Sequence, residues 1–112
     1  MGVFILKLDT PSGPRYLDYS TVIDAPITYG VTLRKFKTYY RKEHGLAGMK
    51  ELETRLARVE EKGTSSLIHD SIADVIEHNR AGKDGTRLTL EQFTDFYAVR
   101  CGKGLEPVGT KR

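Results

Sequence analysis

The sequence contains little that would cross-link the chain or insert it into a membrane. It has a single cysteine, Cys101, so no internal disulfide can form, and this fits a reducing cytoplasm. No apolar run approaches the roughly 20 residues that a transmembrane helix needs. The apolar start, Val3 to Leu8, lacks the basic region and small-residue cleavage site of a signal peptide. We therefore expect a cytoplasmic protein without a membrane segment.

Motifs of known catalytic chemistry are also missing. The run from Lys62 to Ser66 lacks the upstream glycine and the Lys-Ser/Thr pair of a P-loop, and no G-x-S-x-G elbow is present. Between Asn79 and Phe93 the register of an EF-hand fails, because Arg80 takes the place of a calcium-ligating Asp. Cysteine and histidine are too few at ligand spacing to predict zinc. We assign no catalytic residue, metal or cofactor, and predict that the protein is not an enzyme.

What the sequence does have is a net charge of +3 that is unevenly distributed. Residues 1–45 carry 7 basic and 4 acidic side chains, whereas residues 46–101 carry 8 basic and 10 acidic ones. The last stretch, 102–112, carries 3 basic side chains and 1 acidic one. This asymmetry favours a local contact with an anion or an acidic protein over a general coating of DNA.

The most polarised segment runs from Thr32, a good helix N-cap, to Gly45, a good C′ residue. At about 100° per residue, the apolar and aromatic side chains of this segment fall on one arc of a helix. The opposite arc carries five cations: Arg34, Lys35, Lys37, Arg41 and Lys42. One side of the helix is therefore predicted to be buried and the other to be a concentrated positive surface.

This cationic arc, flanked by Tyr39, is the predicted binding site. Its favoured partner is an acidic protein surface or a phosphorylated ligand. In an alternative hypothesis the segment binds a nucleotide or nucleic acid, with Tyr39 stacking on a base. The plainest interpretation is a solvated amphipathic helix without any partner.

The remaining patterns predict an α+β fold in one domain. Residues 3–8 and 15–20 are expected to form an N-terminal β-hairpin around a turn rich in Pro, Gly and Ser. About four short helices follow: residues 32–45, residues 49–62 with Gly63 as a stop, a third that starts near residue 70 or 71, and a last one. The last helix begins with a capping box formed by Thr89 and Gln92. The domain is expected to span residues 1–101, with a mobile tail at 102–112. The predicted core is Phe4, Leu6, Leu33, Phe36, Tyr40, Leu52, Leu56, Val59, Ile72, Val75, Ile76, Phe93 and Tyr97.

Secondary binding candidates lie in three loops. Asp24 lies in the long connection before the basic helix, and long loops in compact domains often carry functional residues. The simpler structural interpretation is that Asp24 caps a turn. Thr64 and Ser65 follow Gly63 and suit either an anion cradle or a connector with hydroxyl-stabilised turns. Arg80 supplies a cation to the loop after the third helix.

An acidic stripe is predicted on the third helix, where Asp70, Asp74 and His78 recur every four residues. Two carboxylates and an imidazole are suitable ligands for a divalent metal. Because no second element offers ligands, a solvated acidic face is expected instead. Two alternatives stay open. In one, these residues join Asp24 in a small metal-dependent hydrolase; in the other, the stripe meets the basic helix of a second copy in a homo-oligomer.

Three fragments, residues 19–26, 55–66 and 79–82, resemble small phage-encoded accessory proteins of unknown function. Together they cover roughly a quarter of the chain. The resemblance implies an accessory or inhibitory protein that acts on a host macromolecule inside a bacterial cell. It implies no catalytic residues.

Overall fold

The centre of the molecule is the predicted N-terminal β-hairpin. The computed structural model describes residues 3–67, 69 and 71–103. Strand β1 (Val3–Thr10) pairs antiparallel with β2 (Gly13–Ser20), and Leu6 lies opposite Leu17. A two-residue strand, β3 (Ala25–Pro26), extends the sheet beyond β2.

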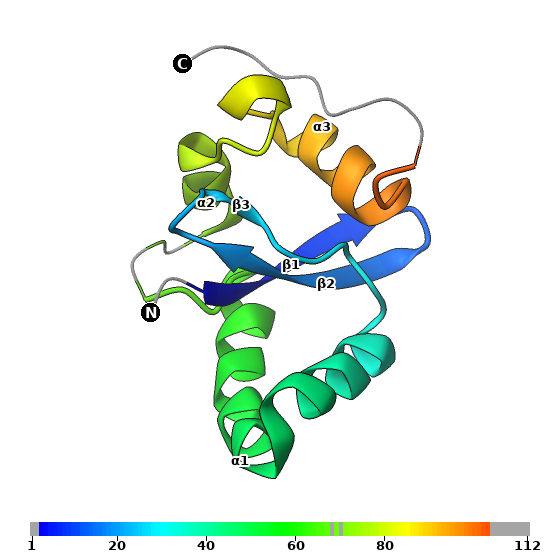
Figure 1. Ribbon diagram of the computed structural model, residues 1–112, viewed down its shortest axis with the longest axis vertical. Coiled ribbons are helices and arrows are strands. Elements are labelled where there is room, and N and C mark those ends of the chain that lie inside the picture. Colours follow the sequence, from blue (N-terminus) through cyan, green and yellow to red (C-terminus); the bar gives the residue numbers. More distant parts are fainter. Residues whose placement is uncertain (1–2, 68, 70, 104–112) are drawn as a thin grey trace.

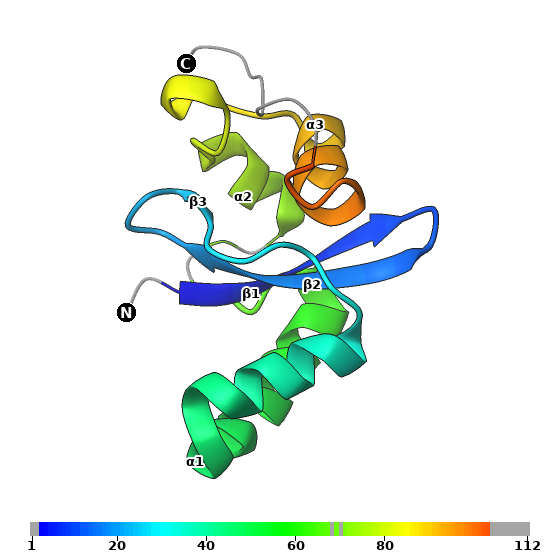
Figure 2. The same cartoon turned by 45° about the vertical axis from the view of Figure 1, so that its right-hand side comes forward.

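Helices cover the sheet on both faces (Figures 1 and 2). Helix α1 (Leu33–Lys62) lies against one face, and α2 (Ile72–His78) and α3 (Leu90–Thr94) lie against the other. A 3-10 turn, η1 (Lys83–Gly85), precedes α3, and a π-helical turn, η2 (Asp95–Val99), continues it. The α+β class is thus confirmed. No helix among the described residues has the length and apolarity needed to span a bilayer.

The number of helices differs from the prediction of about four. The segments expected as two helices, 32–45 and 49–62, form the single element α1, so the described residues contain three α-helices. Gly45 lies inside α1 with φ 67° and ψ −167°, a backbone region that essentially only glycine adopts. The helical dihedral angles are interrupted at Gly45, where the first predicted helix was expected to end, and the two helical halves of α1 form a V below the sheet (Figure 1).

Two hydrophobic clusters fill the layers on either side of the sheet. Side chains of successive strand residues point to opposite faces, and here helices cover both faces. One cluster packs Phe4, Leu6, Leu8, Leu17 and Tyr19 against Val75, Ala81, Leu88, Phe93 and Ala98. The other packs Ile5 and Tyr16 against Phe36, Tyr40, Leu52 and Val59.

The predicted core residues all lie in or against these two clusters. Eight of them are buried, whereas Leu33, Leu56, Ile72, Ile76 and Tyr97 are partly buried and pack against the clusters. The prediction omitted Ile5 and Tyr16, because it did not anticipate cover by α1 on their face of the sheet. It also omitted Leu8, Leu17 and Tyr19, which share the face of the predicted Phe4 and Leu6.

The local signals at the helix ends are confirmed. The Thr89 hydroxyl accepts from the Gln92 N–H, and the Gln92 side chain accepts from the Thr89 N–H. Thr32 caps α1 through its hydroxyl, and Gly63 ends α1 with φ 82°. Two parts of the predictions lie outside the described residues. They are Asp70 of the acidic stripe and residues 104–112, which make up most of the predicted mobile tail.

Candidate functional site

The first half of α1 presents five exposed cations on the side away from the sheet. We call Arg34, Lys35, Lys37, Arg41 and Lys42 the basic face. On the opposite side of the same helix, Phe36 and Tyr40 are almost fully buried in the cluster beneath the sheet. Within the described part of the chain, none of the five cations is in an ion pair. The basic face is therefore accessible and not neutralised by neighbouring carboxylates.

Tyr39 does not belong to this face. Its side chain is only partly exposed, its ring lies 5.7 Å from that of Phe36, and its hydroxyl donates a 2.7 Å hydrogen bond to Oδ2 of Asp18. Burial and the hydrogen bond to Asp18 raise the pKa of Tyr39 well above its usual range. The side chain predicted to stack on a base is instead directed at the sheet.

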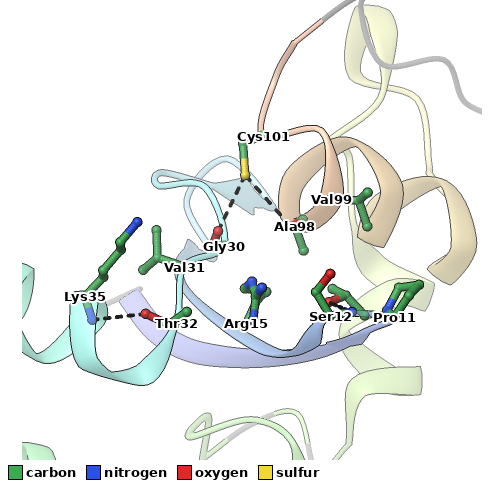
Figure 3. Close-up of a pocket in the computed structure, with 11 residues that line it drawn as sticks. Pro11, Ser12, Arg15, Gly30, Val31, Thr32, Lys35, Ala98, Val99 and Cys101 are labelled. Carbon is green, nitrogen blue, oxygen red and sulfur yellow. Dashed lines mark hydrogen bonds between the residues drawn. The ribbon is translucent and has the colours of Figure 1, made fainter.

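A pocket of about 330 Å³ opens at the N-terminal end of the basic face (Figure 3). Lys35 of the basic face and Arg15 of β2 both line it, together with the hydroxyl residues Thr10, Ser12 and Thr32. Arg15 lies between Lys35 and the hairpin turn, and its guanidinium donates to the carbonyl of Pro14 at 3.0 Å. We call this cavity the basic pocket. Sequence reasoning missed Arg15, because only the packing of α1 beside β2 brings it to Lys35.

The wall of the basic pocket depends on a close backbone approach at Gly30. A Cβ at this position would lie 3.0 Å from Cβ of Ala98 and 3.1 Å from Cβ of Arg15. The Gly30 N–H donates to the carbonyl of Tyr97 at 2.7 Å, and the Cys101 thiol lies 3.5 Å from the carbonyl of Gly30. The connection before α1 is thereby fixed against the C-terminal helices.

A second pocket, of about 420 Å³, lies between the sheet and the bend of α1. It contains Asp18 on the sheet side, and the helix contributes two aromatic and four charged or titratable side chains: Tyr39, Tyr40, Glu43, His44, Glu51 and Arg55. Asp18 is only 2% exposed. Burial raises the pKa of Asp18, whereas the Tyr39 hydrogen bond and the nearby His44 and Arg55 oppose that rise. We call this cavity the acidic pocket.

Thr64 and Ser65 are part of the packed structure. Both are buried, and the Ser65 hydroxyl accepts from the Ile5 N–H at 2.8 Å while the Thr64 hydroxyl accepts from the Ser66 N–H at 3.1 Å. The segment after α1 also accepts from the edge of β1, where the Lys7 N–H donates to the carbonyl of Gly63. These contacts correspond to the connector with hydroxyl-stabilised turns.

Asp24 and Arg80 are brought together through their backbones. The Arg80 N–H donates to the carbonyl of Asp24 at 2.7 Å, and Asp24 has φ 52°. The Arg80 side chain is exposed. The contact joins the loop before β3 to the segment after α2 through main-chain atoms alone.

The third predicted helix yields a cluster that includes an unpredicted member, His69. His69, Asp74 and His78 each offer one atom that lies within 4.8 Å of the others. The His69 Nδ1 lies 3.0 Å from Oδ2 of Asp74, and the two imidazole rings stack with centroids 5.1 Å apart. Tetrahedral bonds of about 2.0–2.1 Å to zinc place ligand atoms roughly 3.3 Å apart, whereas the atoms of this cluster spread over up to 4.8 Å. Asp24, which the hydrolase alternative required, is not a member of this cluster.

Comparison with known proteins finds no family model, no curated protein and no solved structure that matches the chain. Function is therefore inferred from the chemistry of the described residues. The basic face is suited to binding anions, and the basic pocket extends it at one end. The acidic pocket is suited to binding a cation.

Proposed function

We propose that this protein is a non-enzymatic binding module that holds an acidic protein surface on the basic face of α1. The observation that carries the proposal is the set of five exposed cations that have no ion pair within the described residues. Helical surfaces usually alternate charges of both signs, because pairs four residues apart support the helix. A surface with only positive charges lacks that support, but it attracts an anionic partner over a long range.

The shape of the basic face favours a macromolecule over a small ligand. The five cations spread over an arc of about 160° on a convex helix at about 100° per residue. Small molecules are held in concave sites that bury most of their surface. A broad convex surface instead matches a wide acidic surface on another protein, and the basic pocket adds Arg15 at one end of that contact.

The helix is prepared for binding by the core behind it. Phe36 and Tyr40 are 0% and 3% exposed, and they fix this half of α1 against the sheet. Few backbone dihedral angles need to be ordered on association, which lowers the entropic cost of binding. Substitutions on the outer side of the helix should consequently change binding without unfolding the protein.

Nucleic acid is the less favoured partner. Proteins that bind single strands without sequence preference combine cations with aromatic rings on which bases stack. The basic face contains no aromatic residue, and the neighbouring Tyr39 is bonded to Asp18. The resemblance to phage accessory proteins supports a cytoplasmic protein that inhibits or sequesters an acidic host protein. A homo-oligomer that pairs the basic face with acidic side chains of a second copy is the remaining alternative.

The proposal is tested by reversing charge on the basic face. The variant carries Arg34→Glu, Lys37→Glu and Arg41→Glu, and its matched control carries Lys50→Glu, Lys83→Glu and Lys103→Glu. All six positions are exposed, so both variants change net charge equally. Binding is measured by fluorescence anisotropy with a labelled glutamate-rich peptide and with a single-stranded oligonucleotide, at low and physiological salt. Sizing of the free protein at both salt concentrations tests the homo-oligomer.

We expect the wild-type protein and the control to bind the acidic peptide, and the basic-face variant to lose at least tenfold in affinity. Equal binding by the two variants would show that only overall charge matters and would refute the proposal. Tighter binding of the oligonucleotide, with a steep loss of affinity as salt rises, would favour nucleic acid instead.

A further inference from the structure

The acidic pocket contains a buried carboxylate with an unused hydrogen-bonding atom. Asp18 is 2% exposed, and its Oδ1 has no hydrogen-bond partner among the described residues. Its other oxygen, Oδ2, accepts from Tyr39 at 2.7 Å. Buried polar atoms are nearly always paired, because an unpaired one costs about 1–3 kcal/mol, and an exception requires an explanation. A ligand that donates to Oδ1 would supply that explanation.

The bend in α1 creates the cavity that Asp18 lines. Gly45 changes the direction of the helix, so Tyr40 and His44 of the first half and Arg55 of the second half line the same cavity. Gly48 also lines it, at a point where an added Cβ would lie 2.3 Å from Cβ of His44. The cavity of about 420 Å³ is within the usual size range of small-molecule sites.

The charges around the cavity select a positive ligand. Three carboxylates, those of Asp18, Glu43 and Glu51, line it together with a single guanidinium, that of Arg55. Arg55 is directed toward Glu51, with 3.6 Å between Nη2 and Oε2. Asp18 and Glu43 have no ion pair within the described residues. Arg55 and the imidazole of His44 both act on Asp18 and partly offset its charge. Three carboxylates against one guanidinium and one imidazole still leave an excess of negative charge for an entering cation.

Two aromatic rings add a preference for an organic cation. Tyr39 and Tyr40 both line the cavity, and the face of a tyrosine ring attracts an ammonium or guanidinium group within about 6 Å. A bare metal ion would instead require several oxygen or nitrogen ligands close together. The described residues around Asp18 do not form such a group of metal-ligating atoms.

We propose that the acidic pocket binds the ammonium or guanidinium head of an organic cation, with Oδ1 of Asp18 as its principal acceptor. Glu43 supplies additional negative charge at the cavity, and the rings of Tyr39 and Tyr40 contact the carbon chain next to the head group. The head group belongs either to a free amine or to a lysine or arginine side chain of a polypeptide. This site uses neither the basic face nor the basic pocket, so it is independent of the proposed function.

The test is a titration followed by two-dimensional amide NMR. The probes are butylammonium and butylguanidinium, with 1-pentanol as a neutral molecule of similar size. A peptide of sequence Gly-Gly-Arg-Gly-Gly, capped at both ends, distinguishes a side chain from a free amine. We expect saturable shifts of amides near Asp18, Tyr40 and Gly48 with the cations, and no saturation with pentanol.

Two variants distinguish the site from general attraction to an acidic surface. Asp18→Asn removes the charge at nearly constant shape, and Asp9→Asn makes the same change at an exposed position on β1. We expect Asp18→Asn to weaken binding at least tenfold and Asp9→Asn to leave it unchanged. A double variant, Glu43→Gln with Glu51→Gln, alters only exposed side chains, so it reports on the pocket even if Asp18→Asn does not fold. We expect this double variant to bind the cationic probes several-fold more weakly than the wild-type protein.

The inference is overturned if no cationic probe gives saturable shifts, or if Asp18→Asn binds the probes as tightly as the wild-type protein. Equal affinity of the double variant would likewise contradict it. Stronger binding of the arginine peptide than of butylguanidinium would identify a polypeptide side chain as the ligand. The reverse order would identify a free amine or guanidine.

Discussion

The side chains of Asp18 and Tyr39 join the central sheet to α1 through a 2.7 Å hydrogen bond. The tyrosine hydroxyl donates to Oδ2, while Oδ1 stays buried without a partner in the described structure. Burial of the carboxyl group raises the pKa of Asp18 above its ordinary value, despite the opposing effect of Tyr39. Ionisation of the Asp18 carboxyl group therefore disfavours folding.

This raised pKa predicts the direction of a pH effect. Because the folded protein holds this proton more tightly than the unfolded chain does, the contribution of Asp18 to stability is full below the unfolded pKa and is lost as pH rises through the folded pKa. The stability of Asp18→Asn relative to the wild type should therefore increase from pH 4 to pH 7, because only the wild type has a buried carboxyl group to ionise. Urea unfolding of both proteins at both pH values measures this increase. A difference that does not change with pH would contradict the prediction.

The lowered pKa of Glu60 predicts the opposite dependence of stability on pH. Its carboxylate accepts from the Tyr16 hydroxyl at 2.6 Å and from the Lys7 ammonium at 2.9 Å, and these two bonds lower the pKa of Glu60. Its contribution is present above the unfolded pKa and is lost as pH falls through the folded pKa. Glu60→Gln should lower the unfolding free energy near pH 7 by up to about 1 kcal/mol, because the Glu60 side chain is 53% exposed and solvent screens its charge. The loss should be smaller near pH 3.

The control for Glu60 is Glu61→Gln, which alters the exposed neighbour on the same helix. Urea unfolding of both variants at pH 7 and pH 3 provides the comparison. If Glu61→Gln showed the same loss, overall charge and not the contact with Tyr16 and Lys7 would be the cause.

Removing the Asn79 side chain is predicted to cause a large loss of stability. Its fully buried side chain accepts from the Leu88 N–H at 2.9 Å and donates to the Leu88 carbonyl at 2.8 Å. Asn79→Ala would leave both backbone groups buried without their partner and should cost about 3 kcal/mol. Arg80→Ala, at the exposed next position, should cost less than about 0.5 kcal/mol. Chemical denaturation measures both, and similar losses would refute the role of the Asn79 side chain.

Gly45 predicts that the bend in α1 depends on glycine. Its φ of 67° and ψ of −167° are strained for any residue with a Cβ, although no atom lies within 4 Å of an added one. Gly45→Ala should therefore cost about 1–3 kcal/mol through backbone strain alone. Leu46→Ala, at a 71% exposed neighbour, serves as the control in thermal unfolding. A neutral or stabilising Gly45→Ala would mean that the helix continues straight through this position.

Several features were predictable because short-range chemistry determines them. The hairpin follows from β-forming residues on both sides of a Pro-Gly turn, and the capping box of Thr89 and Gln92 involves neighbours three residues apart. The basic face follows from helical periodicity, because charged side chains remain in water when their helix packs. Local sequence could not show the angle between the two halves of α1 on either side of Gly45, because that angle depends on how both halves pack beneath the sheet.

The sequence by itself determined the two hairpin strands, the helix-forming segments and the exposure of the basic face, but not the short strand β3. Tertiary structure decided which polar residues became buried or adjacent. Asp18 lies between the apolar residues Leu17 and Tyr19, a pattern that indicates a solvent-facing position until α1 covers that face. Arg15 of β2 and Lys35 of α1 line one pocket only because α1 packs beside β2. The physical reason is that periodicity assigns residues to faces, whereas burial and charge environment depend on what covers each face.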